Sequence, residues 1–157
     1  ARPWQDPHNA DRRFARVRAR TLLEDLEREL GPGVVAGLAR TARLLHDDAD
    51  VLDALADEAM VRVSPIEGGW EADVDGLLAL PRAVRTRVIR RMCLDAGCPA
   101  EDLTMEHVET VERLASQWTG QGPTSLPARL TASRAYGRLC VVRRPIGHDA
   151  PGGGLAP

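Results

Sequence analysis

Apolar residues recur at helical spacing through the first part of the chain. Residues 2–11 are irregular, with two prolines and several Asp or Asn residues. Apolar positions then follow at intervals of three to five residues: Phe14, Val17, Leu22, Leu26 and Leu30. Asp11 is placed to cap a first turn, and the Gly31-Pro32-Gly33 segment ends the pattern. This predicts a first helix from about residue 11 to residue 30.

The most regular pattern covers residues 34–63. Large apolar residues and small residues alternate there, each series repeating every seven positions. The two series are Leu38, Leu45, Leu52 and Ala59, and Ala42, Ala49, Ala56 and Val63. The stripe predicts one helix of roughly 30 residues, about 45 Å long. We expect a helix that spans the core of a bundle and turns an acidic face to solvent; a homodimeric coiled coil is the alternative.

Shorter elements follow after Ser64-Pro65. The Gly68-Gly69 pair indicates a turn, and residues 70–80 alternate imperfectly, as in a short strand or an extended segment. Pro81 suits the start of a third helix over 82–96, with Val84, Val88 and Met92 as its buried stripe. Thr104 is placed to cap a fourth helix over 105–118. Its expected inward residues are Met105, Val108, Val111, Leu114 or Ala115, and Trp118.

The last third of the chain changes pattern. Residues 125–130 and 134–142 read as two short strands around Thr131-Ala132-Ser133, and residues 147–157 read as a disordered Gly/Pro-rich tail. The predicted fold is therefore mainly α. It is a helical bundle domain with one long helix and a small β element, made of a short strand and a C-terminal hairpin.

Composition supports the helical interpretation and narrows the class of protein. Apolar residues make up 43% and aromatic residues 3%, so Leu, Val and Ala must fill the core. No apolar run has the length of a membrane span, and no secretory signal is visible. We expect a cytoplasmic protein with reduced thiols at Cys93, Cys98 and Cys140. The cysteines and histidines lack the spacing of a metal site, so no metal is expected.

All 21 basic residues are arginine, and the net charge is −2. A GC-rich genome is a sufficient reason for the absence of lysine. Each guanidinium can still bind a phosphate or a carboxylate through two hydrogen bonds. The slightly negative charge argues against a free-standing nucleic-acid binder, although it permits a local basic patch.

One segment resembles a known family. The run Asp6-Pro7-His8-Asn9-Ala10-Asp11, followed by residues 14–20, resembles the Asp-Pro-Ser-Asn-x-Asp and Arg-Asn-x-Ile-Arg motifs of bacterial tRNA(Ile)-lysidine synthetases. His8 stands where Ser is usual, and Val17 where Asn is usual; Arg18 is similar to actinobacterial members. Later segments fall in matching places, so the resemblance covers roughly residues 2–145. These segments are Leu80-Pro81-Arg82, Met105-Glu106-His107, Gly122-Pro123 and Leu126-Pro127.

The resemblance implies a division of the chain and an activity for the intact protein. Residues 1–20 would end an ATP-pyrophosphatase domain and form a hinge, 21–145 would form a helical tRNA-binding domain, and 146–157 a tail. The family is a ligase that uses ATP and Mg²⁺ to adenylate an anticodon cytidine of tRNA(Ile), after which lysine displaces AMP. The phosphate loop Ser-Gly-Gly-x-Asp-Ser is absent from this sequence. We therefore expect no catalytic residue here, and no activity from this fragment alone.

The same resemblance suggests binding residues. Arg16, Arg18 and Arg20 would lie beside the active site, where they contact tRNA phosphates, the nucleotide or the lysine carboxylate; alternatively they pair with nearby acidic residues. Asp6 and Asn9 would fix the loop through an Asx turn or line the pocket.

A second group of arginines gives the best candidate for a patch that contacts the tRNA backbone: Arg82, Arg87, Arg90 and Arg91. A solvated helix face is the simpler interpretation of that group. The alternative function for the whole chain is a helical interaction module that forms a homodimer through residues 34–63 and does not contact RNA.

Overall fold

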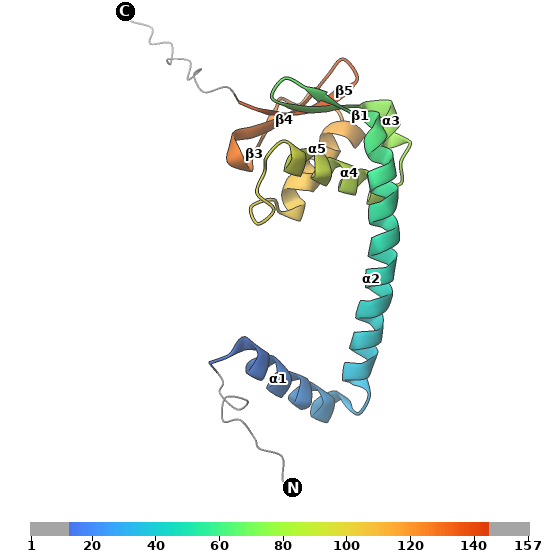
Figure 1. Cartoon of the computed structure of the whole chain (residues 1–157), viewed down its shortest axis with the longest axis vertical. Coiled ribbons are helices and arrows are strands. Elements are labelled where there is room, and N and C mark those ends of the chain that lie inside the picture. Colours follow the sequence, from blue (N-terminus) through green and yellow to red (C-terminus); the bar gives the residue numbers. More distant parts are fainter. Residues whose placement is uncertain (1–12, 145–157) are drawn as a thin grey trace, which may run out of the picture. The chain divides into compact units, whose positions relative to one another are not determined.

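The computed structural model describes residues 13–144 and divides the chain into two compact units, Ala1–Asp50 and Val51–Pro157 (Figure 1). The first unit contains helix α1 (Ala15–Leu30) and the beginning of helix α2 (Val34–Ala59). Helix α1 ends at Gly31, whose φ of 98° suits glycine and whose N–H donates to the carbonyl of Glu27. The side-chain carboxylate of Glu27 also accepts a hydrogen bond, from the N–H of Gly33 (3.0 Å).

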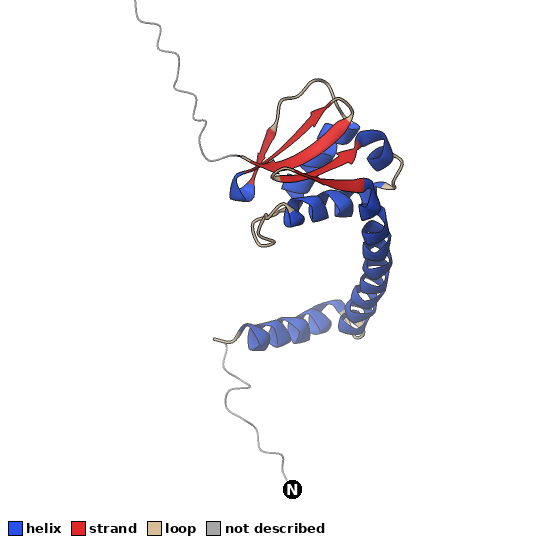
Figure 2. Ribbon diagram, turned by 45° about the horizontal axis from the view of Figure 1, so that its top comes forward, coloured by secondary structure: helices blue, strands red, loops and turns tan. Residues whose placement is uncertain are grey.

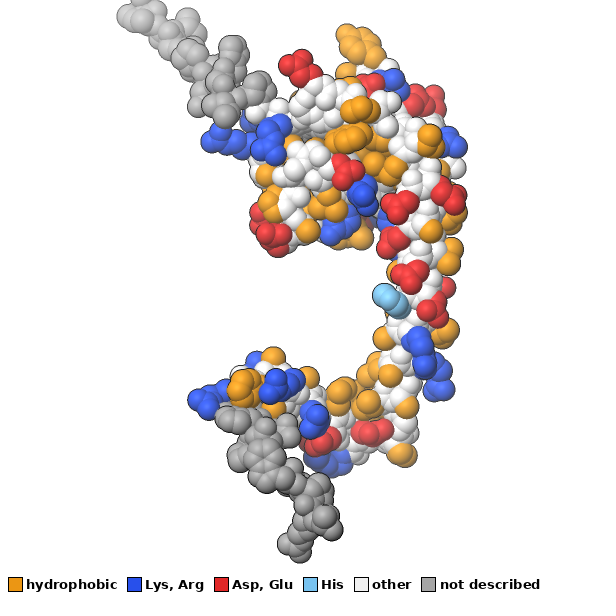
Figure 3. All heavy atoms as spheres, in the orientation of Figure 1, with side chains coloured by type: hydrophobic (Ala, Val, Ile, Leu, Met, Phe, Trp, Pro, Cys, Tyr) orange, Lys and Arg blue, Asp and Glu red, His pale blue; other side chains and the backbone are white. Residues whose placement is uncertain are grey.

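The apolar stripe of α2 is buried only toward its C-terminal end. Ala56, Ala59 and Val63 are buried, whereas Leu38 and Leu45 are 52% and 62% exposed. Among described residues up to Asp50, Val17 is the only buried one. The predicted core-spanning role is therefore wrong for the first half of the stripe, because no described element of that unit covers it. Figure 3 shows acidic side chains along the later turns of α2.

The chain enters a sheet earlier than predicted. A 3₁₀ turn (Met60–Arg62) follows α2, and Val63 begins strand β1 (Val63–Ile66), which pairs with β2 (Gly69–Asp73). The predicted strand over 70–80 is correct only to Asp73, because Asp73 caps a short helix, α3 (Val74–Leu78). Its carboxylate accepts the N–H of Gly76 at 2.8 Å.

The β element is larger than predicted and its hairpin turns elsewhere. Strands β3 (Thr124–Leu126), β4 (Leu130–Ala135) and β5 (Arg138–Arg143) join β1 and β2 in one antiparallel sheet of order β1-β2-β5-β4-β3 (Figure 2). The β4–β5 turn lies at Tyr136-Gly137, both with positive φ, and not at Thr131-Ala132-Ser133. Those three polar or small residues belong to β4, where Ala132 is fully buried.

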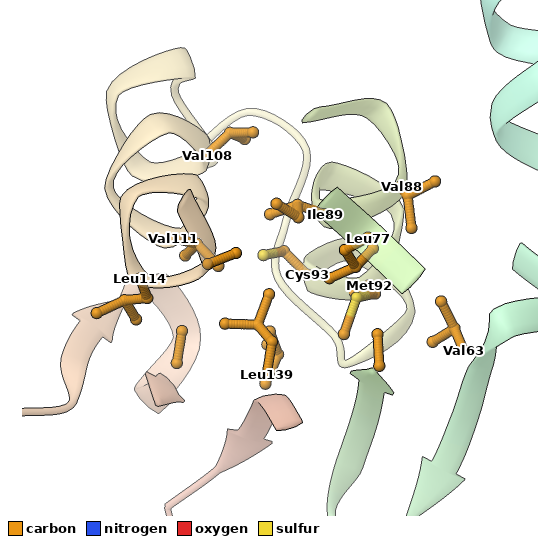
Figure 4. Close-up of a cluster of buried hydrophobic side chains, with 14 of the residues drawn as sticks. Val63, Leu77, Val88, Ile89, Met92, Cys93, Val108, Val111, Leu114 and Leu139 are labelled. Carbon is orange, nitrogen blue, oxygen red and sulfur yellow. The ribbon is translucent and has the colours of Figure 1, made fainter. Parts of the chain in front are cut away.

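Helices α4 (Arg82–Asp95) and α5 (Met105–Ser116) pack against the sheet through β2 and β4 and against each other (Figure 2). The predicted stripe of α4 is buried, as are most of the predicted inward residues of α5 (Figure 4). Met105 and Trp118 are the exceptions, at 64% and 37% exposure. Met105 opens the first turn, and Trp118 lies beyond the helix end, where the guanidinium of Arg134 stands 5.5 Å from its ring.

The prediction of a mainly α chain with a small β element is confirmed. The core of the second unit is aliphatic, with Leu77, Ile89, Met92, Leu130 and Leu139 as its largest fully buried side chains. No helix within residues 13–144 is long and apolar enough to cross a membrane.

Candidate nucleic-acid interface

The arginines predicted as a patch lie on α4, and most of them bind carboxylates of the second unit. Three of the four arginines form ion pairs. Their contacts are Arg82 with Glu109 (2.9 Å), Arg87 with Asp53 (2.6 Å), and Arg91 with Asp95 (3.1 Å) and Asp57 (3.7 Å). Their side chains remain 30–63% exposed, so a phosphate can reach them. A phosphate would, however, have to compete with a carboxylate already in place.

The fourth member of the predicted patch, Arg90, differs from the others. Its Nη1 atom is buried and has no hydrogen-bond partner. Arg90 lines a hollow of about 350 Å³ together with Arg87, Arg91 and the two aspartates Asp53 and Asp57. The structure therefore brings three predicted arginines to one hollow, where two acidic residues offset most of their charge.

The predicted arginines of α1, Arg16, Arg18 and Arg20, are exposed. Arg16 stacks on the Phe14 ring, with 4.9 Å from guanidinium carbon to ring centroid. Arg18 donates to the carbonyl of Arg13 at 3.0 Å. Within residues 13–144, neither Arg16 nor Arg20 forms an ion pair with Glu24 or Glu27. Arg28 of the same helix binds Asp25 (2.8 Å). Asp6 and Asn9 lie outside the described residues.

A third set of arginines, which the sequence did not single out, lies at one end of the sheet. Arg143 ends β5 opposite Leu130, and the N–H of Arg144 donates to the carbonyl of Arg129 at 2.9 Å. The Arg143 guanidinium reaches the carbonyl of Ala96 at 3.5 Å. The sequence could have indicated Arg143 and Arg144, because they are consecutive arginines at the end of a predicted strand. Arg129 could not be added from the sequence, because only the pairing of the strands places it beside them.

His107 has a structural role, and the thiols of the three cysteines have raised pKa values. His107 completes a capping box with Thr104, whose N–H and hydroxyl both lie within hydrogen-bond distance of Nδ1 (3.2 and 3.1 Å). Burial raises the pKa of the Cys93 thiol to about 12, and burial also raises the pKa values of Cys98 and Cys140. Neutral thiols are poor nucleophiles and poor metal ligands. Within residues 13–144, no group of three or more His, Cys, Asp or Glu residues could hold a metal ion.

The segment from Asp73 to Cys140, which includes α3, α4, α5, β3, β4 and the first half of β5, matches the family model of the TilS substrate binding domain. These residues are therefore similar to the TilS substrate-binding domain. The match ends inside β5, so Arg129 falls within the matched segment, and Arg143 and Arg144 lie three and four residues beyond its end. The α4 arginines all lie inside it.

Relatives of the whole chain agree with this domain. The chain is 50% identical over 140 residues to a tRNA(Ile)-lysidine synthase of Thermobifida fusca, and 48% identical over 139 residues to one of Streptomyces coelicolor. It is 43% identical over 150 residues to one of Mycobacterium bovis. These matches cover 88%, 88% and 91% of the chain but 43%, 39% and 46% of the relatives, so the chain spans less than half the length of the proteins it matches. The predicted resemblance is confirmed.

Proposed function

We propose that this chain is the tRNA-recognition and linker part of a tRNA(Ile)-lysidine synthase. The match of residues 73–140 to a TilS substrate-binding domain carries the proposal. The relatives, which are named tRNA(Ile)-lysidine synthase, support the same assignment over 88–91% of the chain. In this proposal, residues 1–20 join a catalytic domain, 21–145 meet the tRNA, and the intact protein is a cytoplasmic ligase.

The chemistry would require groups that this sequence does not contain. ATP, Mg²⁺ and lysine would be bound where a Ser-Gly-Gly-x-Asp-Ser loop is present, and this sequence has none. The contribution of this chain is therefore to bind and orient tRNA(Ile). Correct orientation is itself a large catalytic effect, since it turns an encounter between molecules into a reaction within one complex.

Two sets of arginines are proposed to contact the tRNA. Arg16, Arg18 and Arg20 are exposed on α1, and neither Arg16 nor Arg20 forms an ion pair with a carboxylate of residues 13–144, which supports a role in anion binding. The α4 set, Arg82, Arg87, Arg90 and Arg91, would contribute less per residue. Each phosphate contact there replaces a carboxylate contact or enters a hollow that holds two aspartates.

The test is made on the intact enzyme that carries this chain. Affinity for tRNA(Ile) is measured by anisotropy from 50 to 200 mM salt, and lysidine formation by mass spectrometry of the nucleosides. Changing Arg16 and Arg20 to Gln should weaken binding and flatten its salt dependence, because phosphate contacts release counterions. Wild-type enzyme that neither binds tRNA(Ile) nor forms lysidine would refute the proposal. The matched control is Arg28→Gln, on the same helix but already paired with Asp25.

The alternative function, a helical module that forms a homodimer, is favoured by one observation: the apolar residues on the first half of α2 are exposed. Leu38, Leu44 and Leu45 are 52–62% exposed. A homodimer formed through this stripe would bury them without any RNA contact. Sedimentation of the protein with and without tRNA separates the two functions: a dimer that ignores tRNA at every salt concentration favours the interaction module.

A further inference from the structure

The end of the sheet where β4 begins and β5 ends brings together three arginines that are distant in sequence. Antiparallel pairing sets Leu130 opposite Arg143, and one residue further the N–H of Arg144 binds the carbonyl of Arg129 at 2.9 Å. Neighbouring strands lie about 4.8 Å apart. The side chains of Arg129, Arg143 and Arg144 therefore start from adjacent backbone positions. Figure 3 shows basic side chains gathered where β5 runs into the grey trace.

This sheet-end cluster, defined as Arg129, Arg143 and Arg144, contains no ion-paired member within the described residues, although Asp95 lines a hollow beside Arg143. All three residues are exposed, and none forms an ion pair with a carboxylate of residues 13–144. Arg143 binds a backbone carbonyl at the C-terminal end of α4, where a cation is favoured by the helix dipole. Two other exposed arginines of the same unit, Arg82 and Arg138, bind Glu109 and Glu71.

The backbone that carries Arg129 is strained. Ala128 and Arg129 have φ values of 57° and 60°, so two consecutive residues with a Cβ occupy the left-handed region. Each such residue costs roughly 1–2 kcal/mol, and glycine or asparagine would lower that cost. Strain of this kind is retained where the side chain has a role outside the fold. The strained turn presents an arginine beside two others at a sheet end, which is an arrangement suited to an anion.

We propose that the sheet-end cluster binds consecutive phosphates of the tRNA backbone. This inference rests on the proposed function and names a surface for it. A guanidinium that has no carboxylate partner binds phosphate at a lower cost than Arg82, Arg87 or Arg91, which must first release one. The contact is assigned to the backbone because a guanidinium binds phosphate oxygens through its charge and two hydrogen bonds.

The test changes two charges without disturbing the fold. Arg129→Asn removes the cation and tolerates the left-handed backbone, and Arg144→Gln changes a side chain that forms no hydrogen bond or ion pair in the described structure. Arg143 is left in place because it contacts α4. The control, Arg62→Gln with Arg113→Gln, removes the same charge from exposed arginines that form no ion pair in the described structure. All variants are made in the intact enzyme.

The measurement is tRNA affinity between 50 and 200 mM salt. Two lost phosphate contacts should reduce the steepness of the plot of log K against log salt by about 1.6. Over this fourfold range of salt, the variant should therefore lose roughly ninefold less affinity than wild type loses. The control should keep the wild-type slope. A non-cognate tRNA should show the same change as tRNA(Ile), since phosphate contacts carry no sequence information.

Each other outcome overturns the proposal. An unchanged slope in the cluster variant, with salt-sensitive binding by wild type, removes the cluster and leaves the proposed function standing. An equal effect of the control variant shows general electrostatics and no site, and an effect confined to tRNA(Ile) shows base recognition. Absence of tRNA binding by wild type refutes the proposed function as well. Should Arg129→Asn lower the melting temperature, Arg144→Gln alone gives the decision, with an expected slope change of about 0.8.

Discussion

Removal of the Glu112 carboxylate should destabilise the second unit severely. Glu112 and Arg85 form an ion pair that is almost fully buried, with side chains 7% and 11% exposed and 2.6 Å between Nη2 and Oε1. The Nε of Arg85 donates to the same oxygen (3.0 Å), and its Nη1 donates to the carbonyl of Leu80 (2.9 Å). The other carboxylate oxygen accepts the hydroxyl of Ser116 (3.0 Å). This network joins α4, α5 and the residues between α3 and α4.

The size of the effect follows from that geometry. Glu112→Leu keeps the volume and leaves the Arg85 guanidinium buried with one backbone acceptor, which costs about 3–5 kcal/mol. For a domain of this size, 3 kcal/mol lowers the melting temperature by roughly 12–24 °C. Denaturant unfolding followed by circular dichroism gives the free energy of unfolding directly. The pair Arg82–Glu109 serves as an exposed control, and Glu109→Leu should cost no more than about 1 kcal/mol.

The double variant Arg85→Met with Glu112→Leu decides the mechanism. Replacement of both partners removes the uncompensated charge, so most of the stability lost in Glu112→Leu should return. A double variant no more stable than Glu112→Leu would show that packing, and not the buried charge, sets the cost. A loss below about 1 kcal/mol in Glu112→Leu would show that water reaches Arg85 and that the network contributes little.

Three further predictions concern the sheet and the core. Gly69→Ala should prevent folding or lower the free energy of unfolding by more than about 3 kcal/mol, because a Cβ there would overlap the carbonyl oxygen of Val141. A cooperative thermal unfolding transition like that of wild type would contradict this. Tyr136→Asn should stabilise the protein by about 1 kcal/mol in denaturant unfolding, since Tyr136 has a φ of 49° and its side chain is fully exposed; a loss of stability would be evidence against turn strain. Burial, chiefly, raises the pKa of Cys93 from 9.0 to about 12, so the folded thiol keeps its proton while the unfolded chain ionises. Its contribution to stability is complete below pH 9 and should fall by about 1.4 kcal/mol per pH unit above it; Cys93→Ala should show a shallower decline, and an equal decline would contradict the assignment.

Sequence patterns predicted the helices of the second unit better than its sheet, for a local reason. The spacing of Val84, Val88 and Met92 depends only on the helix that carries them, and all three are buried as predicted. The hairpin depends on which strands pair. Tyr136 adopts a left-handed turn that its residue type disfavours, while Thr131-Ala132-Ser133 has the composition of a turn and lies within β4. Pairing with β5 overrides the local preference of both segments.

The sequence predicted which arginines could bind tRNA, but it did not predict which of them are already paired with carboxylates. The arginines of α4 are evident in the sequence, but their partners Asp53 and Glu109 lie 34 and 27 residues away. Only the packing of α2 and α5 against α4 brings these carboxylates within 3 Å. The sheet-end cluster shows the converse, because strand register joins Arg129 to Arg144 without any helical pattern to indicate it.

These two cases change what the net charge of −2 implies about RNA. A global sum treats each aspartate as a repulsive charge, yet Asp53 and Asp57 already face Arg87 and Arg91 and are compensated where they stand. At physiological salt, exposed charges further apart than about 8 Å are largely screened from each other. A phosphate at the sheet end therefore responds to Arg129, Arg143 and Arg144 and not to the total. The same screening explains why the surface arginines most evident in the sequence need not be those that bind, since local pairing decides which guanidinium is available.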